Sequence, residues 1–336
     1  MTHPKKWLDV RPEGLYCTPG QFYIDPRTAV ETAVITHAHG DHARSGHKRV
    51  FASPDTIAIM KVRYGDDCAE QFVSVPYRDF IIENSVKISF FPAGHILGSA
   101  QILLEYQGSS VIISGDYKRM ADPTCQPFEV HSCDVFITEA TFGLPVFIHP
   151  PIETEIRKLL LSIQQNPSSC HLLGAYALGK CQRLIMVLRE EGFEDTIYLH
   201  GAQIKLCNLY QSLGINLGPL ENAQVLNQTN SAGKLVICPP SALHDRWSRR
   251  FGDLIIANAS GWMQIRARAK QKGIDLPLII SDHADWNELI QTIHEVNPKE
   301  VWVTHGREEA LVYYAQKAGY KAQALSLLGY EDEEDD

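Results

Sequence analysis

The strongest local signal in the chain is His37-Ala38-His39-Gly40-Asp41-His42, six residues that include four side chains able to bind a metal ion. It follows directly on Val34-Ile35-Thr36, a short β-branched run typical of a β-strand. Residues two apart in extended backbone point the same way, so His37 and His39 can face one ion. Gly40 permits a turn that directs Asp41 and His42 toward a second ion. Imidazole with carboxylate suits Zn²⁺, and Mn²⁺ or Fe²⁺ are alternatives.

Further ligands must come from elsewhere, because six residues cannot complete the coordination of two ions. His95, Asp116 and His305 each stand beside a glycine after an apolar run, and each alone would fit an ordinary loop residue. Together with the first stretch they provide seven ligands, which predicts a metal site. The runs expected to be strands are 22–24, 33–35, 86–91, 102–104, 111–113, 135–137 and 301–303.

Length and composition indicate a soluble globular enzyme of one large or two medium domains. The chain has 336 residues, 44% hydrophobic and 21% charged, and no apolar run reaches the ~18–20 residues of a membrane span. Eight scattered cysteines form no C-x-x-C pair, and the first ten residues have no apolar core typical of a signal peptide, so we expect a cytoplasmic protein with reduced thiols and no membrane partner. The formal charge is −9, but six acidic residues stand in the tail 331–336, so local patches decide whether an anionic substrate binds.

The order of segments predicts an insertion. Composition shifts near 145–151, and a helical pattern over 153–165 then opens a smaller α/β unit with segments at 171–174, 181–190, 197–200, 235–238 and 254–257. A strand at 278–280 precedes His283. We therefore predict a discontinuous first domain of residues 1–150 and 258–330, an inserted domain of residues 151–257, and the acidic tail.

The sequence resembles the metallo-β-lactamase superfamily, whose motifs run strand–Asp, H-x-H-x-D-H, His, Asp, His in this order. The stretches TEATFG (138–143), GAYALGKCQRL (174–184), SDHAD (281–285) and VTHG (303–306) are similar to those of its β-CASP nucleases. WVTHG and SGWMQIRARAK resemble the bacterial ligase-associated DNA exonuclease family. The resemblance covers nearly the whole chain. It implies a metallo-β-lactamase αββα sandwich with an inserted, smaller β-CASP-like α/β domain.

The resemblance also implies the role of each site residue. His37, His39 and His95 would bind the first of two divalent metal ions, Zn²⁺ or alternatively Mn²⁺, while Asp41, His42 and His305 would bind the second and Asp116 would bridge. Asp25 would orient a ligand histidine. A hydroxide bridging the metals would attack phosphorus, and His283, held by Glu139, would protonate the leaving group, so the expected catalytic residues are Asp41, Asp116, Glu139 and His283.

Basic residues suggest how a nucleic acid would be held. Arg246, Arg249 and Arg250 flank Trp247, Arg266 and Arg268 follow, and Lys180 and Arg183 stand in the inserted unit. Guanidinium suits phosphate and Trp247 could stack a base, although such residues are often only a solvated helix face.

The expected function is a DNA exonuclease in DNA repair or processing, acting on single-stranded or end-frayed DNA, with repair proteins such as a DNA ligase as partners by resemblance. An RNA-processing exo- or endoribonuclease of the same group is the alternative, because no residue separates RNA from DNA. A small-molecule metallo-hydrolase would not need the insertion, Glu139 or His283, and an inactive scaffold should have lost ligands. G-x-S-x-G, P-loop and G-x-G-x-x-G motifs are absent, so serine-triad and nucleotide-driven chemistry have no support.

Overall fold

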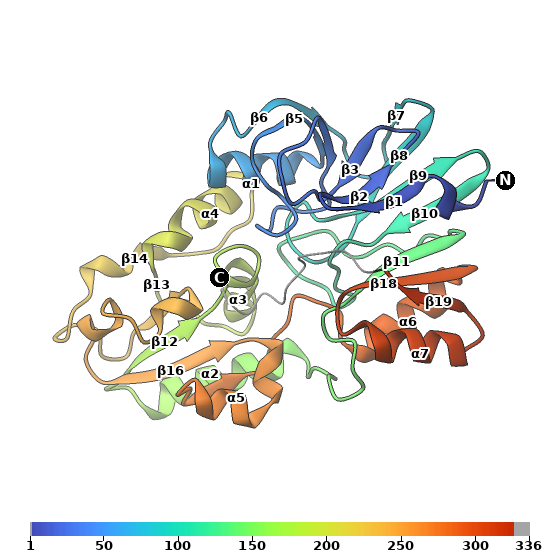
Figure 1. Cartoon of the computed structure of the whole chain (residues 1–336). Helices are drawn as coiled ribbons and strands as arrows, with labels where there is room; N and C mark the ends of the chain where they lie inside the picture. The colour runs from blue at the N-terminus through green and yellow to red at the C-terminus, as the bar shows by residue number, and fades with distance from the viewer. Residues whose placement is uncertain (1, 326–336) are drawn as a thin grey trace. The chain divides into compact units, whose positions relative to one another are not determined.

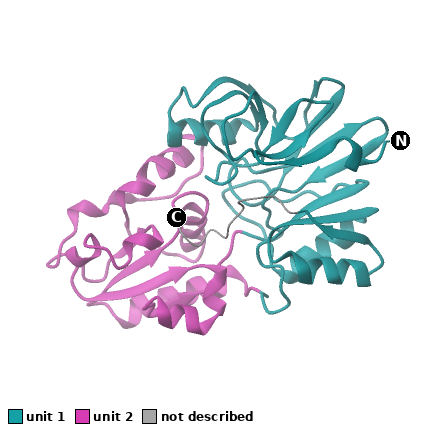
Figure 2. Cartoon of the chain, viewed as in Figure 1, with its two compact units in different colours: residues 1–148, 283–336 teal, residues 149–282 magenta. Residues whose placement is uncertain are grey.

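The computed structural model describes residues 2–325, so the acidic tail 331–336 lies outside the described residues. By its contacts the chain divides into two compact units, coloured separately in Figure 2. Unit 1 takes the residues up to 148 and those from 283 onward, and unit 2 takes residues 149–282. Unit 2 is therefore inserted into the sequence of unit 1. No helix in the described part of the chain has the length and apolar character needed to cross a membrane.

Unit 1 contains two sheets, traced in Figure 1. The first has the order β1 (Leu8–Arg11), β2 (Gly14–Cys17), β3 (Phe22–Ile24), β4 (Thr32–Val34), β5 (His47–Ala52) and β6 (Ala69–Ser74). The second has the order β19 (Lys321–Ala324), β18 (Glu300–Gly306), β11 (Val135–Ala140), β10 (Ser109–Ile113), β9 (Ala100–Tyr106), β8 (Val86–Pro92) and β7 (Phe80–Glu83). Its helical elements are η1 (Pro4–Lys6), α1 (Pro54–Tyr64), α6 (Trp286–Val296) and α7 (Glu308–Lys317).

The alternation of side chains along the strands of unit 1 produces four layers. Val111 and Ile113 of β10 pack into a core shared with Phe22 and Val34 of the first sheet, so the two sheets lie face to face. Ile112, between them in sequence, points to the opposite face, into a second core formed with α6 and α7. On the first sheet α1 contacts β6. The unit is therefore an αββα sandwich, which confirms the fold class expected from the sequence.

Unit 2 is a second α/β unit built on one parallel sheet. Parallel sheets are usually covered by helices, because helices connect their strands. The strand order is β14 (Leu220–Asn222), β13 (Ile197–Leu199), β15 (Leu235–Cys238), β12 (Cys170–Gly174), β16 (Leu254–Ala259) and β17 (Leu276–Leu278), each pair parallel. Its helices are α2 (Ile152–Gln165), α3 (Lys180–Glu190), α4 (Gly201–Ser212) and α5 (Arg266–Gln271), with short η2 (Ala223–Val225), η3 (Pro240–Ala242), η4 (Ser248–Arg250) and η5 (Gly261–Gln264).

The return to unit 1 differs from the expectation. Residues 258–282 belong to unit 2, and the chain re-enters unit 1 at His283 rather than near residue 258. The reason is strand pairing: β16 runs through the expected boundary, and Ala257 and Ala259 pair with Leu276 and Leu278 of β17. The expected strand at 278–280 is thus replaced by β17, which ends at Leu278 and extends the sheet of unit 2.

Candidate metal centre

The candidate ligands of unit 1 lie where its strands end. Strands β3 and β4 are parallel, and β8, β10, β11 and β18 share one direction because β9 is antiparallel to both β8 and β10. Carboxyl ends of parallel strands meet at one edge, which is why residues distant in sequence converge there. Asp25 follows β3, His37 to His42 follow β4, His95 follows β8, Asp116 follows β10, and Glu139 and His305 stand near the ends of β11 and β18.

His37, His39 and His95 form a compact set of imidazoles with Asp116. His39 Nδ1 lies 3.1 Å from His37 Nε2 and 3.0 Å from His95 Nε2. Two nitrogens bound to a tetrahedral Zn²⁺ at ~2.05 Å each stand about 3.3 Å apart, so the spacing of this set already approaches that of zinc ligands. The residues present therefore fit a zinc-type ion.

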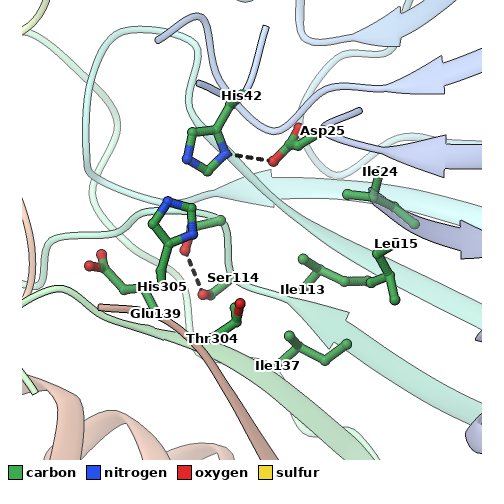
Figure 3. Close-up of a pocket in the computed structure, with 11 residues that line it drawn as sticks. Leu15, Ile24, Asp25, His42, Ile113, Ser114, Ile137, Glu139, Thr304 and His305 are labelled. Carbon is green, nitrogen blue, oxygen red and sulfur yellow. Dashed lines mark hydrogen bonds and ion pairs between the residues drawn. The ribbon is translucent and has the colours of Figure 1, made fainter. Parts of the chain in front are cut away.

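A second set consists of Asp41, His42, Asp116 and His305. His42 Nε2 lies 3.3 Å from Oδ2 of both Asp41 and Asp116, and His305 Nε2 lies 3.6 Å from Asp41 Oδ2. Figure 3 shows the rings of His42 and His305 at the polar end of a small cavity of about 30 Å³, whose other end is lined by apolar side chains such as Ile113. The cavity has room for about one or two water molecules.

Asp116 belongs to both sets. Its Oδ2 lies 3.4 Å from His37 Nε2 in the first set and 3.3 Å from His42 Nε2 in the second. Its Oδ1 is buried and has no hydrogen-bond partner among residues 2–325. A buried carboxylate oxygen without a partner is costly, and a cation would offset that cost. This position between two imidazole sets suits a carboxylate that bridges two ions.

Asp25 orients ligands in both sets through hydrogen bonds. It lies in the left-handed region at φ 44°, and its Oδ2 accepts from His42 Nδ1 at 2.8 Å and from Thr36 Oγ1 at 2.6 Å. Its Oδ1 accepts from the Thr36 N–H at 2.8 Å. Because Thr36 Oγ1 donates to Asp25, it accepts from His37 Nδ1, 3.1 Å away. Both histidines are thereby held with Nε2 as the metal-facing nitrogen.

Glu139 and His283 form a buried pair beside the two sets. His283 Nδ1 lies 3.0 Å from Glu139 Oε2 and 4.0 Å from Asp116 Oδ2. The other oxygen of Glu139 accepts from the Tyr117 N–H at 2.7 Å, so the carboxylate is fixed at both ends. A carboxylate that accepts from Nδ1 leaves Nε2 of His283 as the nitrogen that can exchange a proton with a substrate.

Burial and neighbouring charges shift the pKa values of several residues in this site. Burial lowers the pKa of His37 well below its usual range, and the positive charge of His42 adds to that. Burial also opposes charge on His42, but Asp116, Asp41 and Asp25 outweigh it and hold the pKa of His42 well above its usual range. Burial would raise the pKa of Asp116, yet His42 and its neighbours keep it well below. Binding a cation would therefore displace the proton of His42.

The expected nucleic-acid contacts divide into two classes. Arg246, Arg249 and Arg266 are exposed on unit 2, Arg250 is half-buried, and Arg268 lies 4.5 Å from the centre of the Trp262 ring. Lys180 and Arg183 were expected to contact phosphate, but both are buried. Arg183 donates to the Ser281 carbonyl at 2.9 Å, and both charges lie within 3.5 Å of the Asp282 carboxylate. These two cations hold the end of unit 2 rather than a phosphate. Trp247 is half-buried and packs on Phe251.

The sequence did not single out several residues that support the site. The Thr36 hydroxyl donates to Asp25, and the Tyr117 N–H donates to Glu139. The buried ammonium of Lys118 donates to the backbone carbonyl of His283. Thr141 Oγ1 lies 3.4 Å from His283 Nδ1. Only their position directly beside a ligand motif in the sequence could have indicated them.

Comparisons with known proteins give one matching family model and several relatives. The family model of the Zn-dependent metallo-hydrolase RNA specificity domain matches residues 277–325. The chain is 27% identical over 93% of its length to a probable DNA ligase of Opitutus terrae, of which it spans 30%. It is 26% identical over 70% of its length to an RNase J-like protein of Methanocaldococcus jannaschii, of which it spans 62%. The chain thus spans less than two thirds of the length of either relative.

A solved structure shares the fold at low sequence identity. The crystal structure of a protein of unknown function from Enterococcus faecalis superposes with a TM-score of 0.55 at 14% identity, covering 89% of this chain and 80% of that one. The sandwich with its inserted unit, the matched segment and the relatives together show a metallo-β-lactamase fold with an inserted domain, and they make the chain similar to the β-CASP nucleases and to the ligase-associated family.

Proposed function

We propose that the chain is a dinuclear-metal phosphodiesterase that degrades DNA from an end, in DNA repair or processing. The observation that carries the proposal is Asp116, a buried carboxylate shared by two sets of imidazole and carboxylate donors. Two bound divalent cations would neutralise the phosphodiester and make hydroxide available near neutral pH. Similarity to the probable DNA ligase supports the DNA assignment and a role beside a ligase.

His283 acts as the acid in this proposal. Its Nδ1 is held by Glu139 at 3.0 Å, which leaves Nε2 to give a proton to the departing oxygen. Protonation of a leaving alkoxide is worth roughly 10²–10⁴-fold, whereas a thiolate leaving group needs little help because its pKa is ~8.5. We therefore expect His283→Ala to be impaired on DNA and nearly as active as the wild type on a substrate with sulfur in the 3′-bridging position.

An RNA substrate is the second candidate. It is favoured by the match of residues 277–325 to the model of an RNA specificity domain and by similarity to the RNase J-like protein. The fold and the metal sets suit either nucleic acid, since both candidates cleave the same phosphodiester link. The two proposals differ in substrate, and an endoribonuclease would also differ by cutting within the strand, so one experiment can separate them.

The experiment compares end-labelled single-stranded DNA and RNA of one sequence, with Zn²⁺ or Mn²⁺ supplied separately. We expect faster loss of DNA, with 5′-phosphate and 3′-hydroxyl products released from an end, and no cleavage by Asp116→Ala. Efficient cleavage of circular single strands would contradict exonuclease action. A preference for RNA would favour the second candidate, and no cleavage of either polymer would refute both.

A further inference from the structure

Lys118 is a buried cation two residues after Asp116, with only 1% of its surface exposed. Its Nζ donates to Glu288 Oε2 at 2.6 Å and to the backbone carbonyl of His283 at 3.1 Å. Neither contact is with a residue of the two metal sets. A buried ammonium is costly unless it is paired and hydrogen-bonded, so this geometry is maintained by its partners.

Glu288 is itself fixed on all sides. It closes the capping box of α6, where its Oε2 accepts from the Asp285 N–H at 3.0 Å while Asp285 Oδ1 accepts from the Glu288 N–H at 3.0 Å. Its Oε1 accepts from the Met120 N–H at 2.9 Å. The carboxylate therefore ties the start of α6 to the loop after β10 and holds the ammonium of Lys118 between them.

The same loop contacts His283 and its partner at two more points. The Ala284 N–H donates to the Tyr117 carbonyl at 2.7 Å, and the Tyr117 N–H donates to Glu139 Oε1 at 2.7 Å. The Lys118 N–H also donates to the Ala93 carbonyl at 3.1 Å, close to His95. Residues 117 and 118 thus fix the position of the segment that contains His283.

The position of His283 depends on these hydrogen bonds because His283 is not part of a strand. Asp116, Glu139 and His305 stand at or near the ends of strands of one sheet, whereas His283 is the first residue after the chain leaves unit 2. The residues on both sides of it form neither helix nor strand. Its backbone is located by the hydrogen bonds from Lys118 and to Tyr117, and its ring by Glu139.

We propose that Lys118 is a positioning residue for the reaction. Its ammonium fixes the backbone carbonyl of His283 and so holds the imidazole where it can protonate the leaving group. This inference rests on the proposed function, in which His283 is the acid. Misplacement of a catalytic group by about 1 Å can cost on the order of 10²-fold in rate. We expect Lys118→Met to lower kcat by about 10- to 100-fold with little change in KM, because no substrate contact is removed.

Two variants separate positioning from loss of folding. Lys118→Met leaves the buried Glu288 without its cation, which can destabilise the protein by itself. Lys118→Met combined with Glu288→Gln removes both charges and keeps one acceptor oxygen for the Met120 N–H. Its NH₂ group then faces the Asp285 N–H, so Glu288→Gln alone is measured beside it to separate that effect. Lys299→Met is the matched control, because this lysine pairs with Asp134 at 2.6 Å at the surface of the same unit. The control should keep wild-type kinetics.

The first readout does not depend on nuclease activity. In metal-free protein, the ring signals of His283 in the NMR spectrum are assigned by their loss in His283→Ala. We expect the charge-free double variant to shift these signals and to speed hydrogen exchange of the Ala284 amide by at least tenfold, while Lys299→Met changes neither. Unchanged ring signals and unchanged exchange in a folded double variant would overturn the proposal.

The second readout is kinetic and uses single-stranded DNA with oxygen or sulfur at the 3′-bridging position. If Lys118 acts through His283, its variants recover on the sulfur substrate, and adding Lys118→Met to His283→Ala costs less than about twofold more. Equal impairment on both substrates together with a full additional loss in the double variant would overturn the inference. If sulfur fails to rescue His283→Ala itself, the acid role in the proposed function is wrong, and the NMR result decides the positioning role alone.

Discussion

Replacing Asp25 by Asn should weaken metal binding without removing any ligand. The new amide can still accept from the Thr36 N–H, now 2.8 Å from Oδ1, but it places an NH₂ where Oδ2 accepts from His42 Nδ1 at 2.8 Å. Two donors then face each other, so the ring of His42 must take the tautomer with its proton on Nε2, the nitrogen that points to Asp41 and Asp116. A protonated Nε2 cannot bind a metal ion.

The size of the effect follows from the role of such partners. Loss of the residue that orients a metal-bound histidine typically costs 10–100-fold in affinity, or about 1.4–2.7 kcal/mol. We expect this loss mainly at the set that contains His42. The set of His37, His39 and His95 should change less, because there Asp25 acts on one histidine, His37, through the Thr36 hydroxyl.

The assay is Zn²⁺ binding measured by competition with a chromophoric chelator, together with elemental analysis of the dialysed protein. Wild type should retain about two ions, and Asp25→Asn about one under the same conditions. Thr36→Val is the control that removes the hydroxyl but keeps the carboxylate next to His42. Two ions bound by Asp25→Asn with wild-type affinity would refute the orienting role of Asp25.

The remaining predictions concern metal, pH and substrate contact. His39→Ala should lose at least one ion and all hydrolysis, and activity that survives a chelator in the wild type would contradict a metal mechanism. Burial lowers the pKa of His47 to about 4, whereas an unperturbed histidine titrates near pH ~6.5. As the pH falls from ~6.5 toward 4 the unfolded chain takes up the proton more readily than the fold, so the free energy of unfolding should fall by up to about 3 kcal/mol. In urea unfolding, His47→Asn should therefore lose less stability than wild type between pH 7 and 4.5, and parallel losses would refute this. Alanine at Arg249, Arg250, Arg266 and Arg268 should raise KM and reduce the salt slope by about one per lost contact, whereas an unchanged slope would mean that no phosphate is bound there.

The sequence is most informative where chemistry and a strand end coincide. His37 to His42 stand after a short β-branched run, and the same pattern at His95, Asp116 and His305 suffices to predict that these ligands share one edge of the fold. Such ligands need rare residue types in a tight local pattern, which few other demands on a chain produce. Their grouping into two sets around Asp116 is implied only by resemblance, because spacing along the chain does not give distances between strands.

Other features could not be predicted, because they depend on which surface packs against which. An apolar run near residue 278 indicates a strand, but only the pairing of β17 with β16 assigns it to unit 2. Lys180 and Arg183 have the composition of a phosphate-binding face, yet α3 buries that face and Asp282 neutralises it. Lys118 has the sequence surroundings of an ordinary surface lysine. Its role follows only from the position of Glu288, which is 170 residues further along the chain.

Substitutions near the end of unit 2 should affect His283 more than the candidate metal ligands. The candidate metal ligands stand at or beside strand ends inside a packed sandwich, so that core must deform for them to move. His283 instead joins directly to Asp282, which Lys180 and Arg183 hold within unit 2, while Lys118 and Tyr117 hold His283 and Ala284 within unit 1. The peptide bond between Asp282 and His283 thus joins a residue held by Lys180 and Arg183 to a residue held by Lys118. Substitution of Arg183 should consequently affect protonation by His283 more than metal content. A variant such as Arg183→Met that keeps two ions and recovers on a 3′-sulfur substrate would show this, whereas loss of metal in that variant would show that the anchors on unit 2 support the whole centre.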